Sequence, residues 1–151
     1  MLIRLIWVGR TRDAAAAGWI EEYRRRISHI CPVQIVEIKD AAGKGASRAA
    51  REARDLAKAL PGKGLVVALD EKGREMDSQA FAAFLGKAVT ERHEISFLLG
   101  GSEGLDPDLI AIARERLALS RLTFTHEMAR VLLMEQIYRA FTILRGHPYP
   151  R

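Results

Sequence analysis

Apolar residues along this chain form short runs that alternate with longer segments of helical period. Short apolar runs are typical of buried strands, whereas apolar residues that recur every three or four positions are typical of amphipathic helices. The runs predict strands at residues 2–8, 33–39, 65–70 and 95–99. The run at 65–70 is continuous, as expected of a strand that is buried on both faces of a parallel sheet.

Helical segments separate the predicted strands and follow the last of them. They are predicted at residues 14–30, 48–60, 78–92, from Asp106-Pro107 onward and at 127–144, with a short segment at 117–124 before the last helix. Four side chains of the first helix are expected to face the core, namely Trp19, Ile20, Tyr23 and Ile27. Ser47 and Ser78 are expected to act as N-caps, and residues 71–77 to form a polar loop.

The alternation of strands and helices predicts an α/β fold with a mainly parallel sheet flanked by helices. A chain of 151 residues is long enough for one domain with a well-buried core, and it shows neither a linker nor an internal repeat. We therefore predict a single domain over residues 1–151.

The last helix is apolar on every side. From Met128 to Leu144, 12 of 17 residues are apolar, and at 100° per residue they point in all directions. A helix of this kind must be buried all round, and a terminal helix that covers one face of its own sheet leaves apolar surface for a second subunit. We predict a homodimer, with a central helix sandwiched within one subunit as the alternative.

The chain is basic, with 24 Lys and Arg against 19 acidic residues and a net charge of +5. This balance is compatible with a polyanionic partner such as RNA, but also with an ordinary solvated surface. Two groups of basic residues form candidate patches. They are Arg24-Arg25-Arg26, and Lys44, Arg48, Arg51 and Arg54, which recur at helical spacing.

Several classes of site are disfavoured. The single cysteine, Cys31, rules out an intrachain disulfide or a thiolate cluster, and the four histidines never recur at metal-ligand spacing, so no metal is expected. No apolar stretch reaches the roughly 20 residues that span a bilayer, and the N-terminus does not resemble a signal peptide. We expect a cytoplasmic protein without a membrane partner.

The candidate ligand site is a glycine loop, Gly100-Gly101-Ser102-Glu103-Gly104, directly after the strand at 95–99. Ligands of parallel sheets bind beyond the carboxyl ends of the strands, where Leu69-Asp70 and the turn at 119–124 are also expected. Taken alone, the loop is equally compatible with a tight turn. The chain lacks both the dinucleotide fingerprint after its first strand and a phosphate loop, which argues against kinases, GTPases, Rossmann dehydrogenases and other small-molecule nucleotide enzymes.

Four segments carry a resemblance to a known family. They are Leu98 to Leu105, Leu119 to His126, Met128 to Phe141 and Gly146-His147-Pro148-Tyr149. In these segments, and collinearly over essentially the whole chain, the sequence resembles the RlmH family. That family comprises minimal SPOUT-class enzymes that use S-adenosylmethionine to methylate N3 of a pseudouridine in 23S rRNA of the large ribosomal subunit.

The resemblance implies a SPOUT-type fold with a C-terminal trefoil knot, an exception to the rule against knots, and a homodimer. It implies a cofactor site made by Leu69, Gly100, Gly101, Leu119, Ser120, Arg121, Leu122, Thr123 and Phe124. It places near the RNA-facing site His126, Arg130, Glu135, Tyr138, Arg139, His147 and Tyr149. One departure is Pro150, where the family commonly has histidine.

The chemistry of methyl transfer suggests roles for three of these residues. The N3–H group must lose its proton before or during attack. Our hypothesis is that Arg139 stabilises the developing negative charge, while His126, Glu135 or a water molecule takes the proton. The alternative for Glu135 and Arg139 is an ordinary ion pair on a helix. The alternative for the whole protein, suggested by Pro150, is a non-catalytic RNA-binding ribosome-assembly factor. The alternative for Arg130 is a salt bridge at a dimer boundary, and the alternative for the tail bearing His147 and Tyr149 is disorder.

Overall fold

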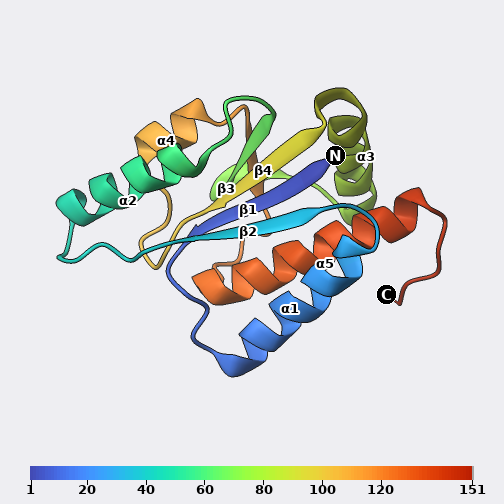
Figure 1. Cartoon of the computed structure of the whole chain (residues 1–151), viewed down its shortest axis with the longest axis horizontal. Helices are drawn as coiled ribbons and strands as arrows, with labels where there is room; N and C mark the ends of the chain where they lie inside the picture. Colours follow the sequence, from blue (N-terminus) through green and yellow to red (C-terminus); the bar gives the residue numbers. More distant parts are fainter. Residues whose placement is uncertain (151) are drawn as a thin grey trace.

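The computed structural model describes residues 1–150 and contains a five-stranded parallel sheet between two layers of helices (Figure 1). The strands are β1 (Leu2–Val8), β2 (Val33–Ile38), β3 (Leu65–Glu75), β4 (Glu94–Leu99) and β5 (Glu115–Ala118). The helices are α1 (Ala14–Ser28), α2 (Ala46–Ala59), α3 (Ser78–Arg92), α4 (Pro107–Ile112) and α5 (His126–Leu144). The predicted α/β class with a parallel sheet is therefore confirmed. No helix in this part of the chain is long and apolar enough to cross a membrane.

The strands follow the order β2-β1-β4-β3-β5, and all neighbouring pairs are parallel. Leu5 of β1 pairs with Ile35 on one side and with Phe97 on the other. Because all strands run the same way, their carboxyl ends meet at one edge of the sheet. The loops after β1, β3, β4 and β5 are therefore brought to a common edge.

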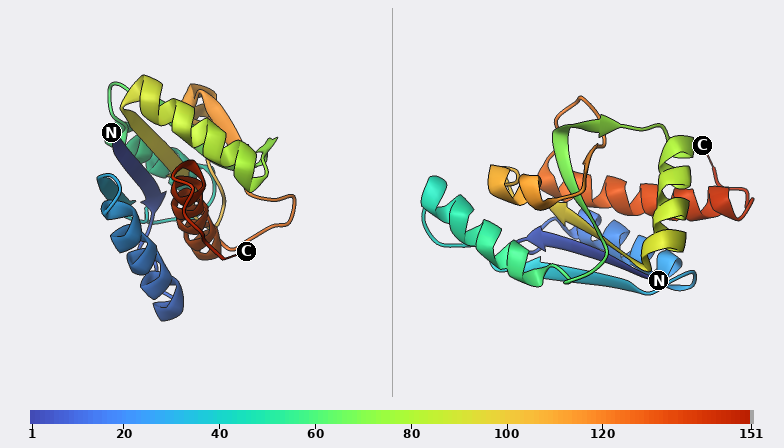
Figure 2. Two further views of the ribbon diagram at one scale, coloured as in Figure 1. Left: turned by 90° about the vertical axis from the view of Figure 1, so that its right-hand side faces the viewer. Right: turned by 90° about the horizontal axis from the view of Figure 1, so that it is seen from above.

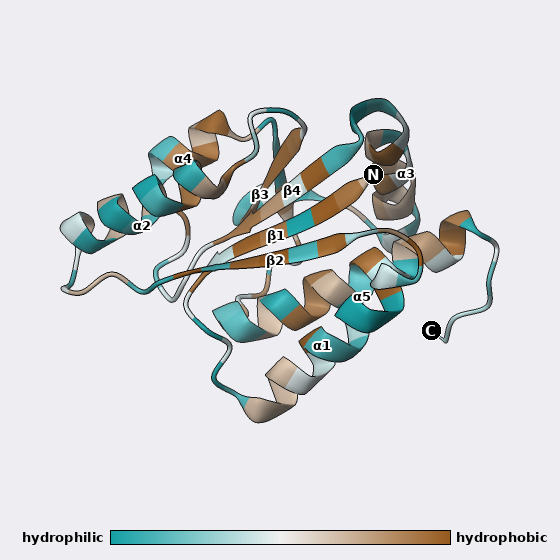
Figure 3. Ribbon diagram, in the orientation of Figure 1, coloured by the Kyte–Doolittle hydropathy of each residue, from teal (hydrophilic) through white to brown (hydrophobic). Residues whose placement is uncertain are grey.

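Both faces of the sheet are covered. α1, α3 and α5 lie on one face and α2 and α4 on the other (Figures 1 and 2). The larger core lies under α1, α3 and α5, and the smaller core contains Ile6, Leu56, Leu98 and Leu109. The strands are mostly hydrophobic, whereas α2 is largely polar (Figure 3). In keeping with this, Leu56 is the only residue that α2 buries fully.

α5 lies in the middle of its layer and packs against both α1 and α3 (Figure 1). Leu133, Met134 and Ile137 are completely buried, while Met128 and Leu144 remain about half exposed. The alternative of a helix sandwiched within one subunit thus accounts for most of its apolar surface. The apolar surface of α5 alone therefore does not require a second subunit.

The predicted polar loop at 71–77 is wrong, because β3 continues to Glu75. The register shifts between Leu69 and Arg74, after which the strand pairs again with β5. Gly73 permits this close approach: a Cβ atom there would lie 2.7 Å from the backbone carbonyl of Arg116. The sequence predicted a loop because Gly73 and its polar neighbours are typical of one.

Other local predictions also need correction. Trp19 does not face the core; its side chain is 52% exposed and stacks on Tyr23 at 5.9 Å between ring centroids. Neither predicted serine is an N-cap. Asp77 caps α3 by accepting a hydrogen bond from the Ala80 N–H, and α2 begins after Gly45 without a side-chain cap.

Candidate functional site

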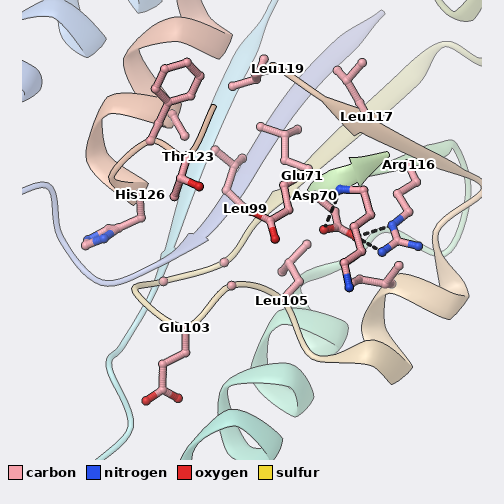
Figure 4. A pocket seen from close by; sticks show the side chains of 18 of the residues that line it. Asp70, Glu71, Leu99, Glu103, Leu105, Arg116, Leu117, Leu119, Thr123 and His126 are labelled. Atoms are coloured by element: carbon pink, nitrogen blue, oxygen red, sulfur yellow. Dashed lines mark hydrogen bonds and ion pairs between the residues drawn. The ribbon is translucent and has the colours of Figure 1, made fainter. Parts of the chain in front are cut away.

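A cavity of about 1080 Å³ opens at the carboxyl edge of the sheet (Figure 4). Its walls come from the end of β3, the glycine loop after β4, the segment between β5 and α5, and the first turn of α5. The first three of these are the segments that the sequence placed beyond the strand ends. Such a volume is sufficient for a nucleoside-sized ligand.

The glycine loop folds tightly on itself. Gly101 and Gly104 form an antiparallel bridge, with the Gly104 N–H donating to the Gly101 carbonyl at 3.1 Å. A Cβ atom on Gly100 would lie 2.2 Å from the carbonyl carbon of Gly104, so that position requires glycine. Gly104 has a φ of +77° and open space where a side chain would be. The loop therefore presents bare backbone to the cavity.

Eight of the nine residues expected to bind the cofactor line this cavity. They are Leu69, Gly100, Gly101, Leu119, Ser120, Leu122, Thr123 and Phe124. The ninth, Arg121, is not among the lining residues; its guanidinium lies in the solvent-exposed part of the loop and forms an ion pair with Glu75 at 3.2 Å.

The cavity also contains an ion pair that the sequence did not reveal. Asp70, where the register of β3 shifts, pairs with Arg116 of β5, and its carboxylate also accepts the Lys72 N–H at 3.3 Å (Figure 4). Leu99 and Leu117 supply apolar wall nearby. The position of Asp70 after a buried strand was a usable signal. Arg116 gave none, because β5 begins two residues before the segment predicted there.

His126 also lines the cavity, as the first residue of α5 (Figure 4). The hydroxyl of Thr125 caps the helix by accepting a hydrogen bond from the Met128 N–H at 3.2 Å. The cap fixes the start of α5 against the cavity. Of the three residues expected to act on the N3–H group, His126 is the one that lines this cavity.

Glu135 and Arg139 form a separate site with the C-terminal tail. Two guanidinium nitrogens of Arg139 donate to one Glu135 oxygen at 2.9 and 2.6 Å, so the expected ion pair is present. A third Arg139 nitrogen donates to the Pro150 carbonyl at 2.8 Å. The guanidinium lies 4.5 Å from the centre of the Tyr149 ring. The tail is therefore held against α5.

Three tyrosines lie beside this ion pair. We call Tyr23, Tyr138 and Tyr149 the tyrosine cluster. Tyr138 meets Tyr149 edge to face at 5.1 Å, and the hydroxyls of Tyr23 and Tyr149 are 3.2 Å apart. Burial raises the pKa of the Tyr149 phenol, which stays protonated at neutral pH. His147 is exposed and does not line the cavity.

The cavity and the tyrosine cluster are far apart within one subunit. Glu135 and Arg139 follow His126 by 9 and 13 helical positions, which at about 1.5 Å per residue corresponds to roughly 14 and 20 Å. The three residues proposed to act on the N3–H group therefore do not converge in a single chain.

Arg130 lies in the interior of the subunit. Its side chain is fully buried, with one nitrogen donating to the Val8 carbonyl at 2.5 Å and another to the Thr11 hydroxyl at 3.0 Å. The guanidinium lies 4.9 Å from the centre of the Trp7 ring. This position gives Arg130 no surface for contact with RNA in the subunit as described.

Comparisons with known proteins identify the family of the chain. A family model described as "Predicted SPOUT methyltransferase" matches residues 1–150. Among curated relatives, "Ribosomal RNA large subunit methyltransferase H" of Anaeromyxobacter sp. (strain K) is 42% identical over 152 residues, covering 99% of each chain. The protein of the same name from Geobacter sp. (strain M21) is 42% identical over 153 residues and covers 99% of this chain and 98% of its own.

Solved structures show the same fold at low sequence identity. A "probable methylase family protein" from Haemophilus influenzae Rd KW20 is 16% identical, with a TM-score of 0.57 over 99% of this chain and 72% of that chain. A probable methyltransferase from Bordetella pertussis Tohama I is 16% identical, with a TM-score of 0.57 over 91% and 95% of the two chains. At this identity the likeness concerns the fold alone.

Proposed function

Because the chain belongs to the SPOUT methyltransferase family, we propose that it transfers a methyl group from S-adenosylmethionine to N3 of a pseudouridine in 23S rRNA. The observation that carries this proposal is the cavity at the carboxyl edge of the sheet. The glycine loop after β4 lines it together with the segments at the ends of β3 and β5. Relatives 42% identical over nearly their whole length bear the name of a large-subunit rRNA methyltransferase.

The cavity fits the chemistry of S-adenosylmethionine. Leu99, Leu117 and Leu119 offer apolar contacts for the adenine, and the bare backbone around Gly104 offers peptide groups for hydrogen bonds. Carboxylates at Asp70 and Glu103 suit the ribose hydroxyls and the ammonium group of a bound methionine. When bound, the cofactor supplies a methyl carbon attached to a positively charged sulfur.

The chain itself must orient the target nitrogen, keep water out and accept one proton. Methyl transfer is an in-line displacement, so holding N3 in position supplies much of the rate acceleration. The N3 proton must pass to a base as the new N–C bond forms. His126 is available for this step from the cavity wall. Glu135 accepts hydrogen bonds from both Arg139 and Gln136, so it is suited to orient Arg139.

We extend the proposal to a homodimer in which the tyrosine cluster and Arg139 of one subunit face the cavity of the other. The separation of roughly 14–20 Å along α5 supports this arrangement. α1 and α5 run side by side in the same direction, since Asp13 contacts Glu127 and Tyr23 contacts Tyr138. This pair of helices leaves Trp19 and Met128 exposed, which suits a subunit interface.

Mixing two inactive variants tests the shared site. His126→Ala and Arg139→Ala should each lose methyl transfer as homodimers. After subunit exchange, each mixed dimer would contain one site with both residues intact, so about a quarter of wild-type activity should return. A monomeric mass in light scattering, or no recovery on mixing, would overturn the dimeric arrangement.

The same proposal includes a single domain over 1–151, a C-terminal trefoil knot and a cytoplasmic location.

Calorimetry with pure protein tests the enzymatic function. Wild-type protein should bind S-adenosylmethionine with one site per chain and should methylate ribosomes prepared from cells that lack it. Absence of cofactor binding would instead favour a non-catalytic ribosome-assembly factor, the alternative suggested by Pro150. Binding without methyl transfer to rRNA would show that the substrate is wrong.

A further inference from the structure

The loop between β1 and α1, Gly9–Asp13, is held by the first turns of α5. The Glu127 carboxylate accepts the backbone N–H groups of Arg12 and, at 3.1 Å, of Asp13. These hydrogen bonds lower the pKa of Glu127, which is therefore ionised at neutral pH. A carboxylate from a segment more than a hundred residues away thus fixes the backbone of this loop.

Arg130 holds the same loop from inside. Its guanidinium bonds the Val8 carbonyl and the Thr11 hydroxyl, and its Nε atom is buried without a hydrogen-bond partner among the described residues. Burying a guanidinium with no carboxylate partner is costly. We interpret this cost as the consequence of fixing the start of the loop.

The glycine that opens the loop is equally constrained. Gly9 has a φ of +78°, and its N–H donates to the Ile38 carbonyl at 2.7 Å. A Cβ atom at this position would lie 2.8 Å from a carboxylate oxygen of Asp40. The backbone is therefore fixed at both ends, whereas the side chains of Arg10 and Arg12 are exposed.

Arg10 and Arg12 carry largely uncompensated positive charge. The side chain of Arg12 is 84% exposed, and its one ion pair, with Asp40, is long at 3.6 Å. Among the residues described, no ion pair involves Arg10. Exposed pairs of this kind contribute little, so a phosphate can displace Asp40 at low cost.

The loop lies beside the cofactor cavity. A Cβ atom on Gly101 of the glycine loop would lie 3.7 Å from the side chain of Val8, directly before the Gly9–Asp13 loop, and Glu127 follows His126 of the cavity wall. A second cavity of about 520 Å³ is lined by the loop residues Arg10, Thr11 and Arg12 together with Trp7, Glu21, Ile35 and Glu37. An RNA strand that places its target base in the first cavity would have room to pass over the loop.

We propose that Arg10 and Arg12 bind the rRNA phosphates that flank the target nucleotide, and that Glu127 and Arg130 are positioning residues for this loop. Guanidinium groups bind phosphates with two parallel hydrogen bonds, and such contacts fix the register of a nucleic acid without reading its sequence. This inference rests on the proposed function, because it concerns the substrate of the same site.

The test compares methyl transfer to ribosomes from cells that lack the protein. In the double variant Arg10→Ala/Arg12→Ala, the KM for ribosomes should rise about tenfold or more, while kcat at saturation and cofactor affinity stay close to wild type. The slope of log affinity against log salt should fall by about one to two. Arg10→Lys/Arg12→Lys should keep the salt slope of wild type, because the charge is retained, but should lose part of the affinity, because lysine cannot form two parallel hydrogen bonds.

Arg92→Ala is the matched control, since this exposed arginine precedes β4 at the opposite edge of the sheet. Its KM and salt dependence should equal those of wild type. If the double alanine variant also behaves like wild type, the loop does not bind rRNA. If wild-type protein itself transfers no methyl group, the proposed function fails instead.

The positioning role is tested by combining substitutions. Glu127→Gln should raise the KM for ribosomes in the wild-type background but add little in the double alanine variant, because the loop then has no phosphate contacts to position. Equal effects in both backgrounds, or an effect on kcat alone, would show that Glu127 does not act through Arg10 and Arg12.

Discussion

Substitution of Gly100 by alanine should damage both the fold and the cofactor site. The added Cβ would lie 2.2 Å from the Gly104 carbonyl carbon, and non-bonded carbon atoms rarely approach closer than about 3.5 Å. The two backbone segments must separate by roughly 1.3 Å, which breaks the hydrogen bond between Gly104 and Gly101. Overpacking costs about 1–3 kcal/mol and the lost hydrogen bond about 1 kcal/mol, so we expect about 2–4 kcal/mol of destabilisation.

The other glycines provide a graded series of controls. Gly62→Ala places its methyl group in open space without a positive φ, so its effect should stay within about 0.5 kcal/mol. Gly104→Ala also has space, but a φ of +77° should cost about 1–2 kcal/mol. Gly101→Ala makes an ordinary contact with Val8 at 3.7 Å and should be tolerated by the fold.

Urea unfolding and calorimetry measure the two consequences separately. Gly100→Ala should show the lowest unfolding midpoint of the series and at least a tenfold loss of affinity for S-adenosylmethionine. Equal midpoints and equal affinities for Gly100→Ala and Gly62→Ala would refute the closed geometry of the loop and its role in the cofactor site.

Three further predictions concern buried or paired groups. Burial raises the pKa of the Cys31 thiol to about 11, so a thiol reagent at pH 8 should label native protein far more slowly than protein unfolded in urea. The lowered pKa of Glu127 means that its contribution to stability is complete above about pH 5 and is lost as the pH falls through the folded pKa. The difference in unfolding free energy between wild type and Glu127→Gln should therefore shrink on acidification, and a constant difference would contradict this. Ser96 is buried without a hydrogen-bond partner for its hydroxyl in the described part of the chain, so Ser96→Ala should stabilise the protein by about 1 kcal/mol in urea unfolding, and destabilisation would contradict this.

Local patterns predicted most of the fold. β1 and β4 are mostly apolar, and the structure gives them nearly the predicted bounds. The continuation of β3 could not be predicted in this way, because it depends on pairing with β5, about forty residues later. Similarly, Trp19 shares the helical period of buried residues, but its exposure depends on where α5 lies.

In the candidate site, too, local patterns predicted some residues, whereas contacts between distant segments could not be predicted. Gly100 and Leu119 were predicted from their position after strands, because the carboxyl ends of parallel strands share one edge. The pairing of Asp70 with Arg116 depends on the register between β3 and β5, which no local pattern contains. The contact between Tyr23 and Tyr149 joins residues 126 positions apart, and it forms only because α1 packs against α5.

Mass spectrometry of rRNA nucleosides tests the central claim most directly. Cells that lack this protein should contain no N3-methylpseudouridine in 23S rRNA, a plasmid with the wild-type gene should restore it, and one with Gly100→Ala should not. Gly62→Ala serves as the matched control and should restore it fully. Unchanged N3-methylpseudouridine in cells without the protein would contradict the proposed reaction.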